Sequence, residues 1–288
     1  MKPYFEGWYF KHQKDGNTVA FIPGRNTDEN GICHTFLQII TNDDSYYIDY
    51  GSSPLILEIH KNSCPSIRLG NSYFSKNGIE IDVQTDNVSI KGLITYGVLS
   101  HIKYDIMGPF KHMPFMQCRH GIISMGHKLY GYINVNGKII DFKGGIGYIE
   151  TDRGDSFPSG YLWTQSNSFF NNSRIDISAA TAVVPLKNIK FKGCICIINY
   201  NKKEYRLATY LGCKILDFNK NNLTIKQGKY KFEVHLIKGN FYELYAPDKG
   251  CMNKSVYESV NSRVQYKFYV KNELLFDICE DHACFEYV

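Results

Sequence analysis

Short segments in which apolar and polar residues alternate run along the whole chain, and Gly, Asn and Asp separate them. The alternation is clear at residues 34–40, 46–50, 79–84, 88–94, 229–237, 241–245, 264–270 and 273–278. Successive side chains of a strand point to opposite faces, so this period is typical of strands with one buried face. A helical pattern is expected only at residues 252–260, as one short helix. The sequence therefore predicts an all-β fold of antiparallel barrels or sandwiches.

Two hairpins can be located from local turn chemistry. Leu129 to Val135 alternates, Asn136-Gly137 follows, and residues 139–142 return. Asn-Gly supplies the two positive-φ positions that a type I′ turn requires. In the second half, residues 193–200 are expected to pair with residues 204–209 across a short turn.

The 288 residues are enough for two domains of about 140 residues each. Residues 144–158 interrupt the alternation with several glycines and Pro158. We place the boundary there, which gives one domain at 1–157 and a second at 158–288. No repeat of fixed period relates the halves.

Charge and motifs exclude several classes of function. The chain has 33 basic and 28 acidic residues, a formal net charge of +5, which does not indicate nucleic acid as a partner. A G-x-S-x-G elbow, a P-loop and a G-x-G-x-x-G loop are all missing from the sequence. The beginning of the chain lacks an apolar export signal, and the nine cysteines have no framework spacing, so we expect a cytoplasmic protein with reduced thiols.

Acid chemistry is the function that the spacing of Glu150 and Asp152 suggests. On a strand these residues would share one face. Two carboxylates on one face of a cavity raise the pKa of one of them, and such an acid can donate a proton. The alternative is a loop in which the carboxylates cap backbone N–H groups or pair with Arg153. Trp163, Gln165 and Asn167 also alternate and would face one interior.

A metal centre is not predicted. Cys118 and His120 would share a face of an extended strand, whereas His127 would face the other side, and this spacing matches no zinc site. A hydrogen-bonded histidine is the expected role of His120. We therefore predict no metal and no cofactor.

Several motifs together resemble the tocopherol cyclase family. They run in order along nearly the whole chain: PYFEGWYFK at residues 3–11, FIPG at 21–24, MQCRHG at 116–121, SMGH at 124–127, GYIETDRGDSFP at 147–158, WTQSN at 163–167 and ATY at 208–210. The motif at 147–158 is the most specific of them. The resemblance implies two lipocalin-like β-barrel domains, related to those of carotenoid hydratases.

The resemblance also implies a reaction and a set of residues. Family members close a chromanol ring by protonating the alkene of a prenylated hydroquinone, and the phenol oxygen then traps the tertiary cation. The implied acid is Asp152 or, second, Glu150. His120 is the third implied catalytic residue, as a polar group that orients the phenol. The implied substrate-binding set comprises aromatic faces for the cation and further polar groups: Trp8, Tyr148, Tyr161, Trp163, Gln117, Gln165 and Asn167.

Three positions depart from the family pattern. Gln117 stands where members often have glutamate, Arg153 where they have tryptophan, and Thr151 where lysine is common. Gln117 removes one possible acid. Arg153 would hold a neighbouring carboxylate ionised if the two were paired.

Two other functions fit the same sequence. One is a non-catalytic carrier of lipids or small hydrophobic molecules, because folds of this kind often bind rather than catalyse. The other is a hydratase, in which water replaces the phenol as nucleophile. The expected partner is a hydrophobic prenylated small molecule, and peripheral contact with a membrane is a further expectation for uptake of such a substrate.

Overall fold

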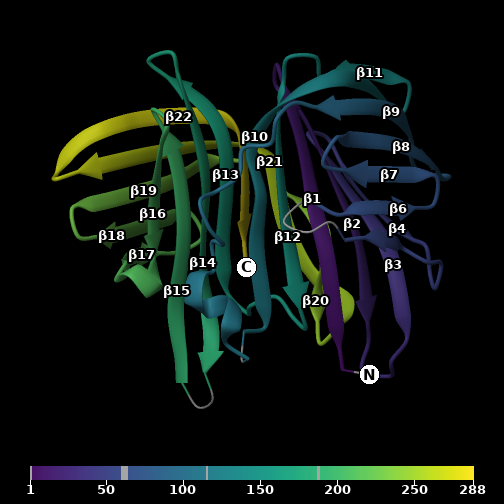
Figure 1. Cartoon of the computed structure of the whole chain (residues 1–288), viewed down its shortest axis with the longest axis horizontal. Coiled ribbons are helices and arrows are strands. Elements are labelled where there is room, and N and C mark those ends of the chain that lie inside the picture. Colours follow the sequence, from purple (N-terminus) through teal and green to yellow (C-terminus); the bar gives the residue numbers. More distant parts are fainter. Residues whose placement is uncertain (1, 60–63, 115, 187–188) are drawn as a thin grey trace. The chain divides into compact units, whose positions relative to one another are not determined.

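The computed structural model describes residues 2–59, 64–114, 116–186 and 189–288. These residues form two antiparallel sheets, one 12-stranded and one 10-stranded over the described ranges (Figure 1). The predicted all-β fold class is therefore confirmed. Within the same ranges, no helix is long and apolar enough to cross a membrane.

The first sheet is built mainly from the first half of the chain. Its strand order is β4 (Ser45–Asp49), β3 (Cys33–Thr41), β2 (Asn17–Thr27), β1 (Tyr4–Lys14), β12 (Ile146–Gly154), β10 (Cys118–Val135), β9 (Ser89–Tyr96), β8 (Gly78–Gln84), β7 (Ser72–Ser75), β6 (Ser66–Leu69) and β5 (Ile56–Glu58), with β11 (Lys138–Asp141) paired to β10. The first strand of the chain therefore pairs directly with β12, which follows it by more than a hundred residues.

The second sheet contains most of the second half. Its strand order is β16 (Lys203–Ala208), β15 (Ile189–Tyr200), β14 (Ser173–Leu186), β13 (Tyr161–Phe170), β22 (Glu273–Tyr287), β21 (Cys251–Val270), β19 (Tyr230–Lys238), β18 (Asn222–Gln227) and β17 (Lys214–Phe218), with β20 (Tyr242–Asp248) paired to β21. Two short 3₁₀ helices complete the elements, η1 (Gly108–His112) and η2 (Thr209–Leu211).

Each sheet coils around its own apolar core. In the first sheet the rings of Phe10 on β1 and Phe74 on β7 lie 5.3 Å apart, although these strands are far apart in the sheet order. In the second sheet the rings of Tyr205 on β16 and Phe268 on β21 lie 5.0 Å apart. No ladder between described residues joins β4 to β5 or β16 to β17, so the sheets coil without closing. Burial of these apolar faces is the main stabilisation of each sheet.

The chain divides into two compact units. Unit 1 comprises Met1–Ile102, His120–Ser156 and Leu244–Lys254, and unit 2 comprises Lys103–Arg119, Phe157–Glu243 and Ser255–Val288. A single boundary does not describe this division, because two segments belong to the unit built from the other half of the chain. The boundary at residue 157 stays a prediction about independently folding domains.

One of these segments is the hairpin Leu244–Lys254, which packs on unit 1. The side-chain amide of Gln38 donates to the carbonyl of Tyr245 at 2.9 Å, and its oxygen accepts from the Tyr245 N–H at 2.6 Å. The turn of the hairpin needs Gly250, since a Cβ there would collide with the carbonyl oxygen of Thr27. These contacts explain why the hairpin belongs to unit 1.

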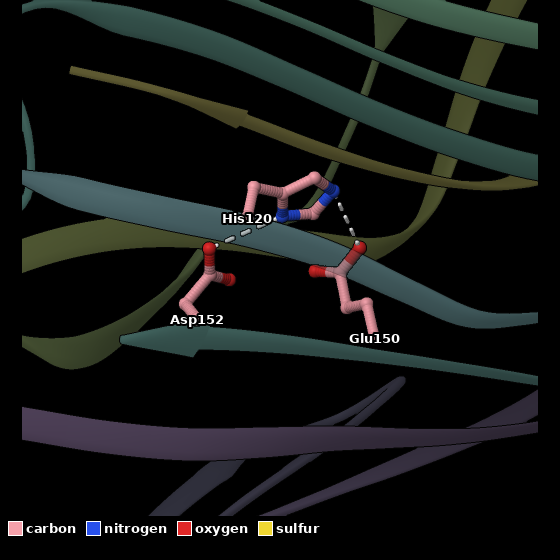
Figure 2. Close-up of side chains that lie close together, drawn as sticks. All are labelled: His120, Glu150 and Asp152. Atoms are coloured by element: carbon pink, nitrogen blue, oxygen red, sulfur yellow. Dashed lines mark hydrogen bonds and ion pairs between the residues drawn. The ribbon is translucent and has the colours of Figure 1, made fainter. Parts of the chain in front are cut away.

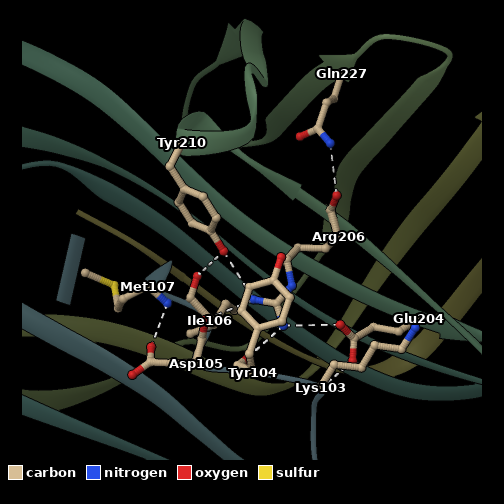
Figure 3. Close-up of polar contacts among 9 residues, drawn as sticks. All are labelled: Lys103, Tyr104, Asp105, Ile106, Met107, Glu204, Arg206, Tyr210 and Gln227. Carbon is tan, nitrogen blue, oxygen red and sulfur yellow. Dashed lines mark hydrogen bonds and ion pairs between the residues drawn. The ribbon is translucent and has the colours of Figure 1, made fainter. Parts of the chain in front are cut away.

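The other segment, Lys103–Arg119, is a strap between β9 and β10 that packs in unit 2 (Figure 3). The guanidinium of Arg206 donates to the carbonyls of Tyr104 at 2.7 Å and Asp105 at 3.1 Å. Its central carbon lies 3.6 Å from the centroid of the Tyr104 ring, a cation–π contact. The strap ends at the residue before His120, so this clamp anchors the chain that leads into that histidine.

Local predictions succeeded at hairpins and failed at two other places. Asn136 and Gly137 have φ of 51° and 88° between β10 and β11, as predicted. The predicted pairing of β15 with β16 is also present, with Tyr200 opposite Lys203. Residues 252–260 lie in strand β21 rather than in a helix, and the buried Val256 stands between the exposed Ser255 and Tyr257, as alternation on a strand requires. Residues 146–154 form strand β12 rather than a break.

Candidate active site

Strand β12 presents its two faces to different environments. Ile149 points into the core of unit 1 and is fully buried. The other face carries Tyr148, Glu150 and Asp152, which stand opposite Lys11, Tyr9 and Gly7 of β1. The strand therefore places both predicted carboxylates on one face, as their spacing indicated. The alternative in which they cap a loop is not what the structure contains.

His120 on β10 lies between the two carboxylates (Figure 2). Its Nδ1 is 3.1 Å from Oδ1 of Asp152, and its Nε2 is 3.5 Å from Oε2 of Glu150. All three residues belong to unit 1. The imidazole thus has one carboxylate at each ring nitrogen.

The two carboxylates differ in their surroundings. The side chain of Glu150 is 6 % exposed, whereas that of Asp152 is 23 % exposed. The hydroxyl of the fully buried Tyr148 donates to Oε2 of Glu150 at 2.6 Å. Asp152 faces Gly7, which has no side chain. Asp152 is therefore the more accessible carboxylate, and Glu150 is the more firmly held one.

This arrangement suits proton transfer. A neutral imidazole has one N–H donor and one acceptor nitrogen, whereas an imidazolium has two donors. If both nitrogens of His120 are to make favourable contacts with the two carboxylates, the cluster must hold one proton more than a neutral imidazole and two ionised carboxylates contain. That proton lies on the ring or on a carboxylate. The three side chains form a unit that can hold, donate and recover one proton.

The same three residues can also offer ligands to a metal ion. One atom from each lies within 4.8 Å of the others. An ion would bind only one imidazole nitrogen, however, and here the two carboxylates lie at opposite nitrogens. One of the two carboxylates would have to move to the other nitrogen's edge of the ring to bind a common ion. The observed geometry fits a shared proton better.

The departures at residues 151 and 153 do not disturb the cluster. Arg153 alternates to the other face of β12, stands opposite Glu6 and is exposed. Within the described part of the chain it forms no ion pair with Glu150 or Asp152. The hydroxyl of Thr151 donates to the carbonyl of Gly7 at 2.9 Å. Arg153 thus points away from the two carboxylates.

The structure does not bring Trp8 to this cluster. Trp8 is 3 % exposed and packs in the core of unit 1, on the face of β1 opposite to Tyr9 and Lys11. Its predicted contact with the same cation as Tyr148 is not supported, because alternation along β1 turns it to the other side.

The remaining predicted residues belong to unit 2. Tyr161, Trp163, Gln165 and Asn167 share one buried face of β13. The amide of Gln165 donates to Asn167 at 2.8 Å. Gln117 lies in the strap. Their roles as substrate-binding residues stay predictions.

Sequence reasoning overlooked Lys11 and Gly7. Lys11 is only 1 % exposed and stands opposite Tyr148, and Gly7 stands opposite Asp152. The available signal was the alternation of Gly7, Tyr9 and Lys11 within the motif at residues 3–11. It became informative only once β1 was known to pair with β12.

On the core face of β1, His12 forms a separate buried contact. Its Nδ1 lies 3.3 Å from the carbonyl of Val19 and its Nε2 lies 2.7 Å from the hydroxyl of Tyr96. Because a carbonyl only accepts, Nδ1 carries the proton and Nε2 accepts from Tyr96. Burial lowers the pKa of His12 to about 3. His12 is therefore neutral and belongs to the core, not to the cluster.

Comparison with known proteins identifies the class of fold. The chain aligns over 100% of its length with kievitone hydratase from Nectria haematococca, at a TM-score of 0.58 and 12% identity over 88% of that chain. It aligns over 99% with the structure of CghA, at a TM-score of 0.61 and 7% identity over 88% of that chain. A putative AttH from Nitrosomonas europaea aligns at a TM-score of 0.51 and 8% identity, over 100% of this chain and 92% of that chain. These likenesses confirm the two-domain, lipocalin-like all-β fold.

The family follows from the sequence itself. The tocopherol cyclase-like family model matches residues 73–286, which is most of the chain and includes His120, Glu150 and Asp152. No curated protein matches the sequence. The chain belongs to the tocopherol cyclase-like family.

Proposed function

We propose that this protein is an acid-catalysed enzyme of the cyclase or hydratase type, and that it closes a ring in a prenylated hydroquinone or related terpenoid. The observation that carries the proposal is the imidazole of His120 set 3.1 Å from Asp152 and 3.5 Å from Glu150 in a largely buried cluster. Membership of the tocopherol cyclase-like family supports it. The reaction needs a proton donor that is recovered at the end of each cycle, which such a cluster can supply.

The proposed steps balance without a co-reactant. The His120–Asp152 pair gives its proton to the less substituted carbon of a trisubstituted alkene, which breaks the π bond and leaves a tertiary cation. The phenol oxygen bonds to that cation, and the phenol proton returns to the cluster. Product and substrate therefore have the same mass. Glu150 keeps the imidazole oriented through the cycle.

The proposed substrate is a hydrophobic prenylated small molecule. Aromatic faces stabilise a cation by their quadrupole, and Tyr148 lies beside Glu150 in unit 1. We assign Tyr161, Trp163, Gln165 and Asn167 of β13 to substrate binding on the strength of their shared buried face. We also propose peripheral contact with a membrane for uptake of such a substrate, and a cytoplasmic location.

Hydration is the second candidate. The side chain of Asp152 is 23 % exposed and stands opposite a glycine, which favours access of water to the proposed acid. The solved structure of kievitone hydratase has a similar fold, although the identity of 12% carries no substrate across. Water attack on the same cation would add the mass of one water to the product.

A turnover assay separates these reactions. Purified protein is incubated with a short-tailed and a long-tailed prenyl hydroquinone without cofactors, and the products are followed by chromatography and mass spectrometry. A shifted retention at unchanged mass indicates ring closure, and a gain of one water indicates hydration. We expect Asp152→Asn to lower turnover at least about 100-fold, because it removes the proton donor, while ligand binding persists.

The matched control is Asp155→Asn. Asp155 is exposed, lies in the same segment and stands outside the cluster, so turnover should stay within about twofold of the original. Full activity in Asp152→Asn would remove Asp152 from the mechanism. Binding of both hydroquinones without any product would instead favour a carrier.

A further inference from the structure

Two buried cysteines of unit 2 interact with each other and take no part in the proposed reaction. Cys194 lies in β15 and is 2 % exposed, and Cys213 follows η2 and is 6 % exposed. Both belong to the apolar core of unit 2. A buried cysteine is most often a small apolar packing residue. The contacts of this pair give it a further property.

The backbone brings the two residues together. Ile195, which follows Cys194 on β15, pairs with Ala208 at the end of β16. The N–H of Cys213 donates to the carbonyl of Ala208 at 3.0 Å, so the turn through η2 folds back onto this strand end. Gly212 has a φ of 84°, which allows the chain to reverse immediately before Cys213. Cys213 therefore returns to the neighbourhood of Cys194.

The side chains make the two sulfurs unequal. The thiol of Cys213 is hydrogen-bonded to the sulfur of Cys194. The hydroxyl of Thr209 accepts from the N–H of Cys194 at 2.8 Å and lies 3.5 Å from its sulfur. The hydrogen bond from Cys213, with a smaller contribution from Thr209, lowers the pKa of Cys194 in spite of burial. A thiolate is the nucleophilic form of cysteine, so Cys194 is the more reactive member of the pair.

We propose that Cys194 and Cys213 form a redox-active pair that a peroxide converts into a reversible disulfide. The Cys194 thiolate attacks one peroxide oxygen, the O–O bond breaks, and Cys194 becomes a sulfenic acid while hydroxide leaves with the proton that Cys194 lost. The sulfur of Cys213 then attacks the sulfenic sulfur, an S–S bond forms, and the hydroxyl leaves as water with the Cys213 proton. Two thiols are oxidised, and hydrogen peroxide is reduced to two molecules of water.

A bridge at this position would fasten η2 to β15. Tyr210 of η2 donates to the carbonyl of Ile106 in the strap at 2.8 Å, and Arg206 donates to the Tyr210 hydroxyl at 3.2 Å (Figure 3). Oxidation would therefore restrain the segment that anchors the strap. The pair does not depend on the proposed cyclase or hydratase reaction.

The test is a disulfide map of the full-length protein. Reduced protein is treated with hydrogen peroxide and unfolded in urea with an alkylating reagent that labels every remaining thiol. Trypsin then cleaves at Lys192 and Arg206, which places Cys194 and Cys213 on different peptides. We expect these peptides to be joined, at a mass lower than their sum by two hydrogen atoms, and dithiothreitol should separate them. Alkylated Cys194 and Cys213 in protein whose exposed Cys33 and Cys279 are oxidised would overturn the proposal.

Cys196 supplies the matched control, because it lies on the same tryptic peptide as Cys194. It is fully buried, and burial raises the pKa of its thiol well above the ordinary value. The joined peptides should persist in Cys196→Ala and disappear in Cys194→Ala. The reverse pattern would show that Cys196 is the partner of Cys213 and would contradict the assignment. The map of the original protein needs neither a variant nor a substrate, so its result is separate from any failure to find turnover.

Discussion

Gly7 shows how a single residue can open a site without being needed for the fold. A Cβ added at Gly7 would lie 3.8 Å from Cγ2 of Ile22 and 3.9 Å from the carbonyl oxygen of Pro23, which is ordinary contact. Packing within unit 1 therefore does not demand glycine. The position nevertheless stands opposite Asp152, the accessible carboxylate. We infer that the missing side chain leaves room for the group that takes the proton.

This reading predicts that Gly7→Val folds but loses activity. Valine suits a strand, so the thermal midpoint should stay within a few degrees. Turnover of the prenyl hydroquinone should fall at least about tenfold, because a branched side chain would occupy the space beside Asp152. The contrast variant is Gly24→Ala, whose Cβ would collide with the Phe36 ring, so it should lose stability instead. Full activity in Gly7→Val would contradict the assignment.

At the scale of elements, strand β12 marks the limit of sequence reasoning. Its glycines predicted a break, but Gly147 serves close packing, since a Cβ there would collide with Nε2 of His127. Sequence does not distinguish a glycine that turns the chain from one that admits a neighbouring ring. The shared face of Glu150 and Asp152 was nevertheless predictable, because alternation on a strand depends only on spacing.

Hairpins were predictable because their turns are local. Asn136-Gly137 and Asn201-Lys202 adopt positive φ in both cases, and the flanking strands pair as expected. The contact of His120 with the carboxylates was not predictable in detail. It depends on β10 lying beside β12, a pairing between strands whose order in the sheet does not follow the sequence.

At the scale of the whole molecule, the chain length indicated two units. The sequence did not indicate which segments belong to each unit. The strap Lys103–Arg119 and the hairpin Leu244–Lys254 each pack in the unit built from the other half of the chain. Their anchors are single polar residues such as Arg206 and Gln38. Neither anchor stands out by composition or periodicity, because each acts through hydrogen bonds to distant backbone.

Stability of the whole molecule should fall in acid because of His12. Burial lowers its pKa to about 3 in the folded protein, against the ordinary histidine pKa of 6.5 in an unfolded chain. Between those values the unfolded state binds more protons, so the free energy of unfolding rises with pH and is lost as pH falls from 6.5 towards 3. The contribution has a slope of up to about 1.4 kcal/mol per pH unit.

Urea unfolding at several pH values checks this prediction. His12→Gln should be less stable than the original near neutral pH and should show a shallower dependence on pH below 6.5, because the glutamine does not titrate. His112→Gln, at an exposed position, should keep the original slope. An identical slope in His12→Gln would show that His12 does not carry this dependence.

The most direct test of the central claim is the turnover reaction in D₂O. If the cluster protonates the alkene carbon, the ring-closed product must contain one deuterium that does not exchange back in H₂O. Mass spectrometry should then show a product one mass unit heavier than the product from H₂O, and recovered substrate without stable label. A ring-closed product that contains no carbon-bound deuterium, or protein that gives no product from any prenylated phenol, would contradict acid catalysis by His120, Asp152 and Glu150.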